Sequence, residues 1–337
     1  MVTLQKDVSP ENFLSILNEL VEKIEQNEEI RHALTTISIK KPSKFYKLKV
    51  FESEVKLYKN FPPKFAHHRK ALLKTHAIVE NHEYVKCVIT TKTNSSDIDI
   101  HLNNFEVFRA LLCLLYTHEF HIKFDNQKNP LNKVMLGYAH TLHNAEGEAL
   151  GENIWYEPQY YQNRVSDIDD LNKKKLVKII SKIHKCKYSD DLKKSLIMYV
   201  KALDEFDHNI SIMLLWNGLD VLLNEKKGNY ENISKRIKCI FGKKSHELDV
   251  INALRVTRNQ YVHEAIQNNQ SKYYCLTLRT LFYKVFAFYL NYLHDCKSKS
   301  EALEIIDQLN QIAESRRKIK RINKSIKIDR ILKKASK

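Results

Sequence analysis

Glycine is scarce in this sequence: six glycines occur among 337 residues, and the first of them is Gly137. Loops that cradle phosphate groups need closely spaced glycines, as in the patterns G-x-x-x-x-G-K-[ST] and G-x-G-x-x-G, so both kinds of nucleotide-binding loop are excluded. Proline is absent after Pro158. The second half of the chain therefore lacks the residue that most strongly interrupts a helix.

Cysteines and long apolar runs are also few. The six cysteines contain no C-x-x-C pair, which predicts a reducing, cytoplasmic location and argues against a structural zinc site. No apolar run approaches the roughly 18 residues of a membrane span, and LLCLLY at 111–116 is too short. The first residues, MVTLQKDVSPENF, lack the apolar core of a secretion signal. We therefore expect no membrane partner and no cofactor.

Positive charge is concentrated at the C-terminal end. The formal net charge is +16, and residues 315–337 contain eleven Lys or Arg and one acid, which gives a net +10 there. Isoleucines at 319, 322 and 326 repeat at helical spacing against a basic face, which predicts an amphipathic helix. Such a helix can lie on another domain, on RNA phosphates or on an acidic partner, and RNA is preferred. A membrane surface is disfavoured because the helix has no aromatic anchor, and a merely solvated helix is the alternative. The residues of this tail expected to bind RNA are Arg316, Arg317, Lys318, Lys320 and Arg321.

Periodicity divides the chain into three parts and predicts a mainly α protein. Residues 1–165 mix helical and strand patterns, which predicts an α+β domain whose role, sensory or regulatory, is open. Residues 166–296 carry one helical pattern after another and predict an all-α bundle, and 297–337 predict a basic helical tail. Helices are expected at 10–34, 104–117, 170–184, 190–204, 206–225, 230–241, 246–264, 269–296 and 300–335. Strands are expected within 36–60 and at 83–93 and 97–102, with extended segments at FHIKF (120–124) and NIWYEPQYY (153–161).

Two short patterns in the first domain suggest chemistry weakly. Asp97 and Asp99 are spaced like the D-x-D pair with which minimal nucleotidyltransferases hold magnesium, but the upstream glycine–serine turn of those enzymes is missing. HEFH at 118–121 and HTLH at 140–143 each contain two histidines three residues apart. This spacing lets both bind one metal only if the segment is helical, and no third ligand recurs at a suitable interval. We interpret the first pattern as a strand edge facing solvent, and the histidines as polar helix ends and loops.

The stretch LRVTRNQYVHEA at 254–265 is the strongest candidate for a site. On an ideal helix over 246–264, Arg258 falls on the apolar face with Val250, Leu254 and Tyr261. A guanidinium facing the core needs an acid beside it. The residues predicted on the opposite face of this helix are Arg255, Asn259 and His263.

An acid in an earlier helix can meet this arginine. Over 207–225 the predicted buried stripe contains Ile212, Met213, Trp216, Leu219 and Leu223, and Asp220 falls inside it. We therefore expect Asp220 to pair with Arg258. On an ideal helix Arg258 and His263 are about 140° apart. They meet one phosphate only if the helix loosens near Val262, if His263 lies in the turn that follows, or if they come from two subunits of a dimer.

Four segments together resemble a HEPN domain of the Apea-like kind over roughly residues 190–296: LLWNGLDVLL, NISKRIKCIFG, INALRVTRNQYVHEA and YYCLTLRTLFYKVFAFYLNYL. That family has an R-x(4–6)-H motif, often with a polar residue after the arginine, and Arg258, Asn259 and His263 match it. Asp220 matches the acidic residue of an earlier helix, with Asp in place of the more usual Glu. The resemblance does not extend to the first 165 residues.

This resemblance implies a homodimeric, metal-independent endoribonuclease that cuts tRNA or mRNA, leaving 2′,3′-cyclic phosphate and 5′-OH ends. It implies a toxin or an effector of antiviral defence by abortive infection, controlled by an antitoxin or a phage-derived trigger. His263 would be the acid/base, Arg258 the stabiliser of the transition state, Asn259 an assistant, Asp220 a supporting partner and Arg255 an RNA contact. A non-catalytic RNA- or protein-binding HEPN module, an antitoxin-like nucleotidyltransferase and a purely structural ion-paired helix remain alternatives.

Overall fold

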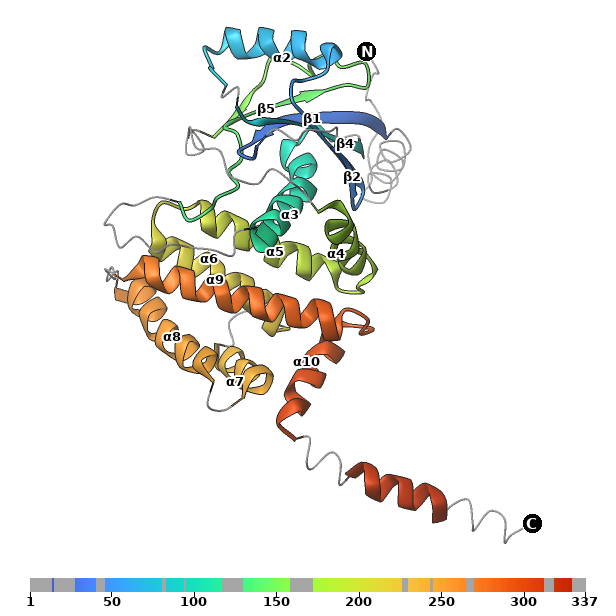
Figure 1. Cartoon of the computed structure of the whole chain (residues 1–337), viewed down its shortest axis with the longest axis vertical. Helices are drawn as coiled ribbons and strands as arrows, with labels where there is room; N and C mark the ends of the chain where they lie inside the picture. Colours follow the sequence, from blue (N-terminus) through green and yellow to red (C-terminus); the bar gives the residue numbers. More distant parts are fainter. Residues whose placement is uncertain are drawn as a thin grey trace, which may run out of the picture. The chain divides into compact units, whose positions relative to one another are not determined.

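A computed structural model shows two compact units, Met1–Phe120 with Asn132–Ile180 and His121–Leu131 with Ser181–Lys337 (Figure 1). The residues that the structure describes are 14, 28–40, 46–80, 83–93, 95–116, 130–157, 172–225, 230–242, 245–264, 270–311 and 318–328. The predicted class is confirmed in outline, because a mainly helical chain carries an α+β region in its N-terminal half.

The first unit contains a six-stranded antiparallel sheet in the order β2-β3-β4-β1-β5-β6. Its strands are β1 (Glu29–Ile37), β2 (Tyr46–Val50), β3 (Ser53–Tyr58), β4 (Val85–Thr93), β5 (Ala139–His143) and β6 (Trp155–Tyr156). The long strands β1 and β4 pair along their whole length, from Glu29 opposite Thr93 to Ile37 opposite Val85.

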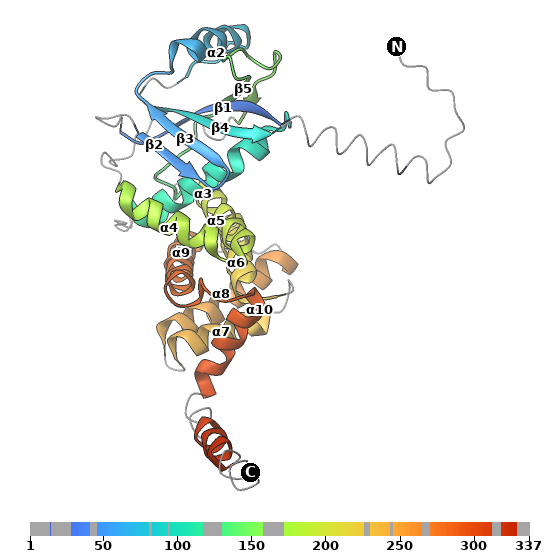
Figure 2. The same ribbon diagram turned by 90° about the vertical axis from the view of Figure 1, so that its right-hand side faces the viewer.

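Helices α2 (Pro63–Thr75) and α3 (Ile98–Tyr116) cover opposite faces of this sheet (Figures 1 and 2). On one face, Phe65 of α2 packs into a buried cluster with Leu34 and Val88. On the other face, Asn104 of α3 donates a hydrogen bond to Ser53 Oγ at 3.0 Å. These contacts identify the sheet face that each helix covers.

The two faces of the sheet differ in chemistry because successive side chains of a strand point to opposite sides. The strand register gives the α3 face mostly apolar side chains, namely Ala33, Ile37, Val55, Leu57, Cys87, Ile89 and Leu142. The same register gives the α2 face polar side chains around Leu34 and Val88, namely His32, Thr36, Lys86, Thr90, Thr141 and His143. The face under α2 is therefore a buried polar layer.

The second unit is helical. Its elements are α5 (Ser189–Asp204), α6 (His208–Leu223), α7 (Tyr230–Phe241), α8 (His246–Glu264), α9 (Ser271–Phe288) with its π-helical continuation η2 (Tyr289–Leu293), α10 (Lys299–Gln308) and η3 (Leu309–Gln311). Helix α4 (Lys173–Lys185) precedes them and runs across the division between the units. Helix α6 contacts α5, α7, α8 and α9, and its Leu215, Trp216 and Leu219 are fully buried. Residues 318–328 are also helical.

Several element predictions for the first domain are wrong. Residues 29–34, expected to end a helix over 10–34, belong to the central strand β1, where pairing with both β4 and β5 outweighs a helical pattern. The segment 97–102 is a helix start, because Asp97 Oδ1 accepts from the backbone N–H of Asp99 at 3.0 Å and thereby caps α3. HTLH at 140–143 is strand, not helix end or loop. Three predicted segments lie outside the described residues: 10–13 with 15–27 of the expected helix, HEFH, and FHIKF.

Candidate functional site

Helix α8 presents the Arg258–Asn259 pair near its C-terminal end. Its packed side is formed by Ile251 and Leu254, both fully buried, and by Thr257, which is 8% exposed. The predicted apolar face with a core-facing Arg258 is therefore wrong: Val250, Arg258 and Tyr261 are only half-buried and flank the packed stripe. Asn259 is exposed. Arg258 Nη1 donates to Asn259 Oδ1 at 3.1 Å. Arg258 is therefore partly exposed at the surface of α8, with a polar side chain beside it.

Asp220 is buried as predicted, but its hydrogen-bond partner is another residue. The side chain is 7% exposed, and its Oδ1 accepts from Asn224 Nδ2, one turn later on the chain, at 2.6 Å. Asn224 is also the C-cap of α6, with its backbone N–H donating to Asp220 O. The expectation of a buried acid is thus confirmed, and the carboxylate braces the C-terminal end of α6 by bonding Asn224.

A different arginine ties the end of α6 to neighbouring helices. Arg236 of α7 donates to Leu223 O and, from Nε and Nη2, forms a two-pronged ion pair with Asp307 of α10 at 3.2 and 2.9 Å. Its Nη1 lies 3.4 Å from Asn224 Oδ1. Arg236 therefore joins three helices by bonds that a lysine cannot reproduce.

His263 belongs to α8 by its backbone, which is helical through Glu264; its side chain lies outside the described residues. A turn that begins at His263, one of the three arrangements considered, is therefore wrong, since the helix continues past His263. Five residues on a regular helix separate Arg258 and His263 by about 140° around the axis and about 7.5 Å along it. One copy of the chain thus directs the two positions of the motif to different sides of α8.

The remaining predicted RNA contacts are on the surface. Arg255 of α8 is half-buried. Lys318, Lys320 and Arg321 are exposed on the helix 318–328, and isoleucines 319, 322 and 326 of the same helix are 57%, 57% and 45% exposed. Arg316 and Arg317 lie outside the described residues. The described part of the tail has the amphipathic character that its sequence predicts.

Metal chemistry finds no support in the described ranges, where no group of three or more His, Cys, Asp or Glu side chains is placed to hold an ion. Asp97 and Asp99 are exposed in the first turn region of α3, so the expected strand-face carboxylate pair is wrong. His140 and His143 lie three apart on β5, which turns them to opposite faces of the sheet. His140 Nδ1 lies 2.7 Å from Thr35 Oγ1 on the α3 face.

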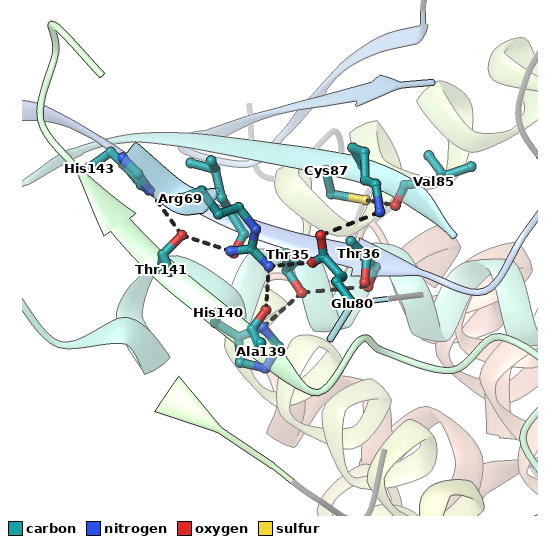
Figure 3. Close-up of polar contacts among 12 residues, drawn as sticks. Thr35, Thr36, Arg69, Glu80, Val85, Cys87, Ala139, His140, Thr141 and His143 are labelled. Carbon is teal, nitrogen blue, oxygen red and sulfur yellow. Dashed lines mark hydrogen bonds and ion pairs between the residues drawn. The ribbon is translucent and has the colours of Figure 1, made fainter. Parts of the chain in front are cut away.

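A polar network of the first unit lies under α2 and centres on Arg69 (Figure 3). Arg69 is 1% exposed. Its Nη1 donates to Leu34 O at 3.0 Å and to Thr141 Oγ1 at 2.7 Å. Its Nη2 donates to Glu80 Oε1 at 2.5 Å and to Ala139 O at 2.8 Å. One guanidinium therefore joins α2 to strands β1 and β5 and to the segment before β4.

Charges and histidines complete this network. Lys86 Nζ lies 3.4 Å from Glu80 Oε2; burial raises the pKa of Glu80, but Arg69 and Lys86 outweigh it and hold the pKa below its usual value. His143 Nε2 lies 2.9 Å from Thr141 Oγ1 and its Nδ1 lies 3.0 Å from Gly147 O. Burial lowers the pKa of His143 to about 4. Neutral, hydrogen-bonded and fully buried, this histidine is suited to holding β5 in place.

Sequence reasoning missed this network because its members are far apart in the chain. Arg69 contacts residues 35 and 72 positions away, Leu34 and Thr141, and no short motif records such pairs. One local signal was present: Pro62 and Pro63 stand at the N-cap and first turn of α2, where proline favours a helix start. Recognising α2 would have placed Arg69, six residues after Pro63, on a helix and so on a packing face.

Comparison of the chain with protein-family models, with curated proteins and with solved structures gives no match. Within the described ranges, no helix is both long and apolar enough to cross a membrane.

Proposed function

We propose that this chain is a metal-independent endoribonuclease of the HEPN type, with Arg258, Asn259 and His263 of α8 as its reacting groups. The observation that carries the proposal is the partly exposed Arg258 near the C-terminal end of α8, which donates to Asn259 Oδ1 at 3.1 Å. A guanidinium in this setting can meet an external phosphate with two parallel hydrogen bonds. The same helix carries a histidine in its last turn.

The chemistry uses the nucleophile that RNA itself supplies. The 2′-oxygen attacks the neighbouring phosphorus, the bond from phosphorus to the 5′-oxygen breaks, and a 2′,3′-cyclic phosphate and a 5′-OH form. One group takes the proton of the 2′-OH and another protonates the departing 5′-oxygen, and an imidazole can do either near neutral pH. Arg258 stabilises the charge on the phosphoryl oxygens in the transition state. Asn259 orients the guanidinium, and Asp220 supports α6, against which α8 packs.

The proposal places a complete site in a homodimer. Within one copy, about 140° of helix rotation separates Arg258 from His263, so a second copy must supply the missing half. The outer side of α8 offers a surface for this contact, because Ala253 and Val256 are exposed, Val256 by 55%. His263 follows Val256 by seven residues and therefore shares its side of the helix.

The first test measures cleavage of total tRNA by the full chain in EDTA. The His263→Ala variant should lose about 10²–10⁴-fold of the rate, and the products should carry 2′,3′-cyclic phosphate ends. The matched control is His246→Ala, which removes an exposed histidine from the opposite end of α8 and should cut at the wild-type rate. Cleavage that needs magnesium, or equal losses in both variants, would contradict the proposal.

The second test mixes Arg258→Ala and His263→Ala proteins, each inactive alone. If each site takes its arginine and histidine from different copies, half of the dimers in an equilibrated equal mixture are heterodimers with one intact site of two. About a quarter of the wild-type activity should then return. A mixture as inactive as its components shows that both groups act within one copy.

A non-catalytic RNA- or protein-binding module is the second candidate, and the continuous helix through Glu264 favours it, because a lone copy separates the two motif positions. Under this alternative, tRNA binds but remains uncut at any protein concentration. A role as a toxin or defence effector is part of the first proposal only. It predicts that expression of the wild-type chain, but not of His263→Ala, arrests the growth of cells.

A further inference from the structure

Helix α4 and its flanks form a second basic segment, distinct from the tail. Residues 172–188 contain seven lysines and one histidine, with no Asp, Glu or Arg. Asn172 caps the helix, since its Oδ1 accepts from the backbone N–H of Lys175 at 3.0 Å. Lysines 173, 174 and 175 fill the first turn, where the helix dipole favours acids and disfavours cations. These three lysines therefore make an unfavourable interaction with the helix dipole.

The lysines of α4 are arranged on one side of it. Leu176 and Ile183 are fully buried and Ile180 is 5% exposed, so the apolar side of the helix is packed inside the protein. Steps of 100° per residue place Lys174, Lys178 and Lys185 within about 20° of the direction opposite Leu176. All three are exposed. They span about 16 Å along the helix axis, which is too long for a single phosphate.

Several lysines of the described residues are paired with acids, whereas these three are not. Lys47 pairs with Glu54 at 2.5 Å, and Lys284 pairs with Glu247 at 2.6 Å. Among the residues that the structure describes, no carboxylate forms an ion pair with Lys174, Lys178 or Lys185. Within the part of the chain that the structure describes, no acid competes with an external anion for these three charges.

We propose that the lysine stripe of α4, Lys174–Lys178–Lys185, binds the phosphate backbone of RNA independently of base sequence. The choice of RNA rests on the proposed ribonuclease function. A membrane is disfavoured because an interfacial helix must bury its apolar side in lipid, and that side of α4 is already buried in the protein. The stripe holds neither arginine for two-pronged base contacts nor an aromatic ring for base stacking. The stripe would therefore recognise the negative charge of the phosphates and not the bases.

The test measures binding of labelled total tRNA over a series of salt concentrations. The protein is the full chain carrying His263→Ala, so that RNA is not cut during the measurement. Each bound phosphate contributes about 0.7 in a single strand and about 0.9 in a duplex to the slope of log affinity against log salt, and tRNA contains both. Removing three lysine charges, as K174Q/K178Q/K185Q, should therefore lower that slope by about 2–3. The control K59Q/K70Q/K74Q removes three exposed lysines elsewhere and should leave the slope unchanged.

The outcomes separate this inference from the proposed nuclease. An unchanged slope in K174Q/K178Q/K185Q, an equal fall in the control, or failure of the protein to bind tRNA overturns the lysine stripe. The stripe is also overturned if K174Q/K178Q/K185Q loses binding to vesicles of anionic lipid or to an acidic polypeptide but keeps its binding to tRNA. Absence of cleavage by the wild-type chain, with the slope still falling by about 2–3 in the α4 variant alone, overturns the nuclease and supports the RNA-binding stripe.

Discussion

Arg69 is an almost completely buried arginine whose guanidinium bonds two strands and Glu80. Removing one partner of a buried ion pair leaves the other charge without compensation, at a cost of about 3–5 kcal/mol. We therefore expect Arg69→Met to lower the free energy of unfolding by about that amount in urea denaturation. The losses caused by Arg69→Met and by Glu80→Gln should not add in the double variant, because the two side chains bond one another. The neighbouring exposed Lys70→Met should change stability by less than about 0.5 kcal/mol.

Buried histidines should make the protein sensitive to mild acid. Burial lowers the pKa of His32 and of His143 to about 4 and that of His140 to about 3. The unfolded chain, with a histidine pKa near 6.5, binds more protons than the folded chain below that pH. Each histidine therefore contributes stability that is present above about pH 6.5 and is lost as the pH falls toward its folded pKa, by up to about 1.4 kcal/mol per pH unit.

The measurement is urea unfolding of matched variants between pH 6.5 and 4.5. His143→Gln should reduce the slope of stability against pH by up to about 1.4 kcal/mol per unit, because the proton uptake of this site is gone. His67→Gln removes an exposed histidine and should keep the wild-type slope. If both variants follow the wild-type profile, His143 is not a source of the acid sensitivity.

Residue burial was more predictable from the sequence than residue partners. Helical spacing placed five apolar residues of α6 on a buried stripe with Asp220 inside it, and all of these are buried except Met213, which is half-buried. The same spacing paired Asp220 with a distant arginine, whereas the structure gives its carboxylate the side-chain amide of Asn224, four residues away. Helical spacing predicts the direction in which a side chain leaves its helix, but not which of several polar groups lies nearest to it in space.

At the scale of elements, the loop between β5 and β6 depends on two glycines with positive φ, Gly147 at 97° and Gly151 at 86°. A Cβ at Gly147 would lie 2.6 Å from Lys64 O, whereas one at Gly151 meets nothing within 4 Å. Gly151→Ala should therefore cost only the backbone strain, about 1–2 kcal/mol. Gly147→Ala should cost about 1–3 kcal/mol more, because the start of α2 must shift. Equal midpoints of thermal unfolding for the two variants would contradict this close approach.

Elements of the second half were predictable because their apolar residues repeat with a helical period and no proline interrupts them. The expected helices 230–241 and 246–264 agree with α7 and α8 at both ends. The first half was harder to predict because strand pairing there overrides local pattern. β1 binds partners about 60 and 110 residues away, β4 and β5. The segment 97–102 alternates like a strand, yet its first carboxylate caps a helix.

At the scale of the whole molecule, charge is distributed in separate basic segments. Residues 315–337 carry a net +10 of the total +16. A version of the chain ending at Glu314 should therefore bind tRNA more weakly and with a smaller dependence on salt, by about 0.7–0.9 in slope for each phosphate that the tail no longer binds. If the full and shortened chains bind tRNA equally at each of two salt concentrations, the tail has no part in the binding. The α4 variant provides the comparison, since its lysines remain in the shortened chain.

The strand order also determines how the sheet can associate with other copies. Its edges are β2, where Lys47 and Lys49 alternate with buried residues, and β6, which has only two residues. Lysines on an edge strand and a very short edge strand both discourage hydrogen bonding to a strand of another molecule. Fibril-like growth by strand addition at these two edges of the described sheet is therefore disfavoured.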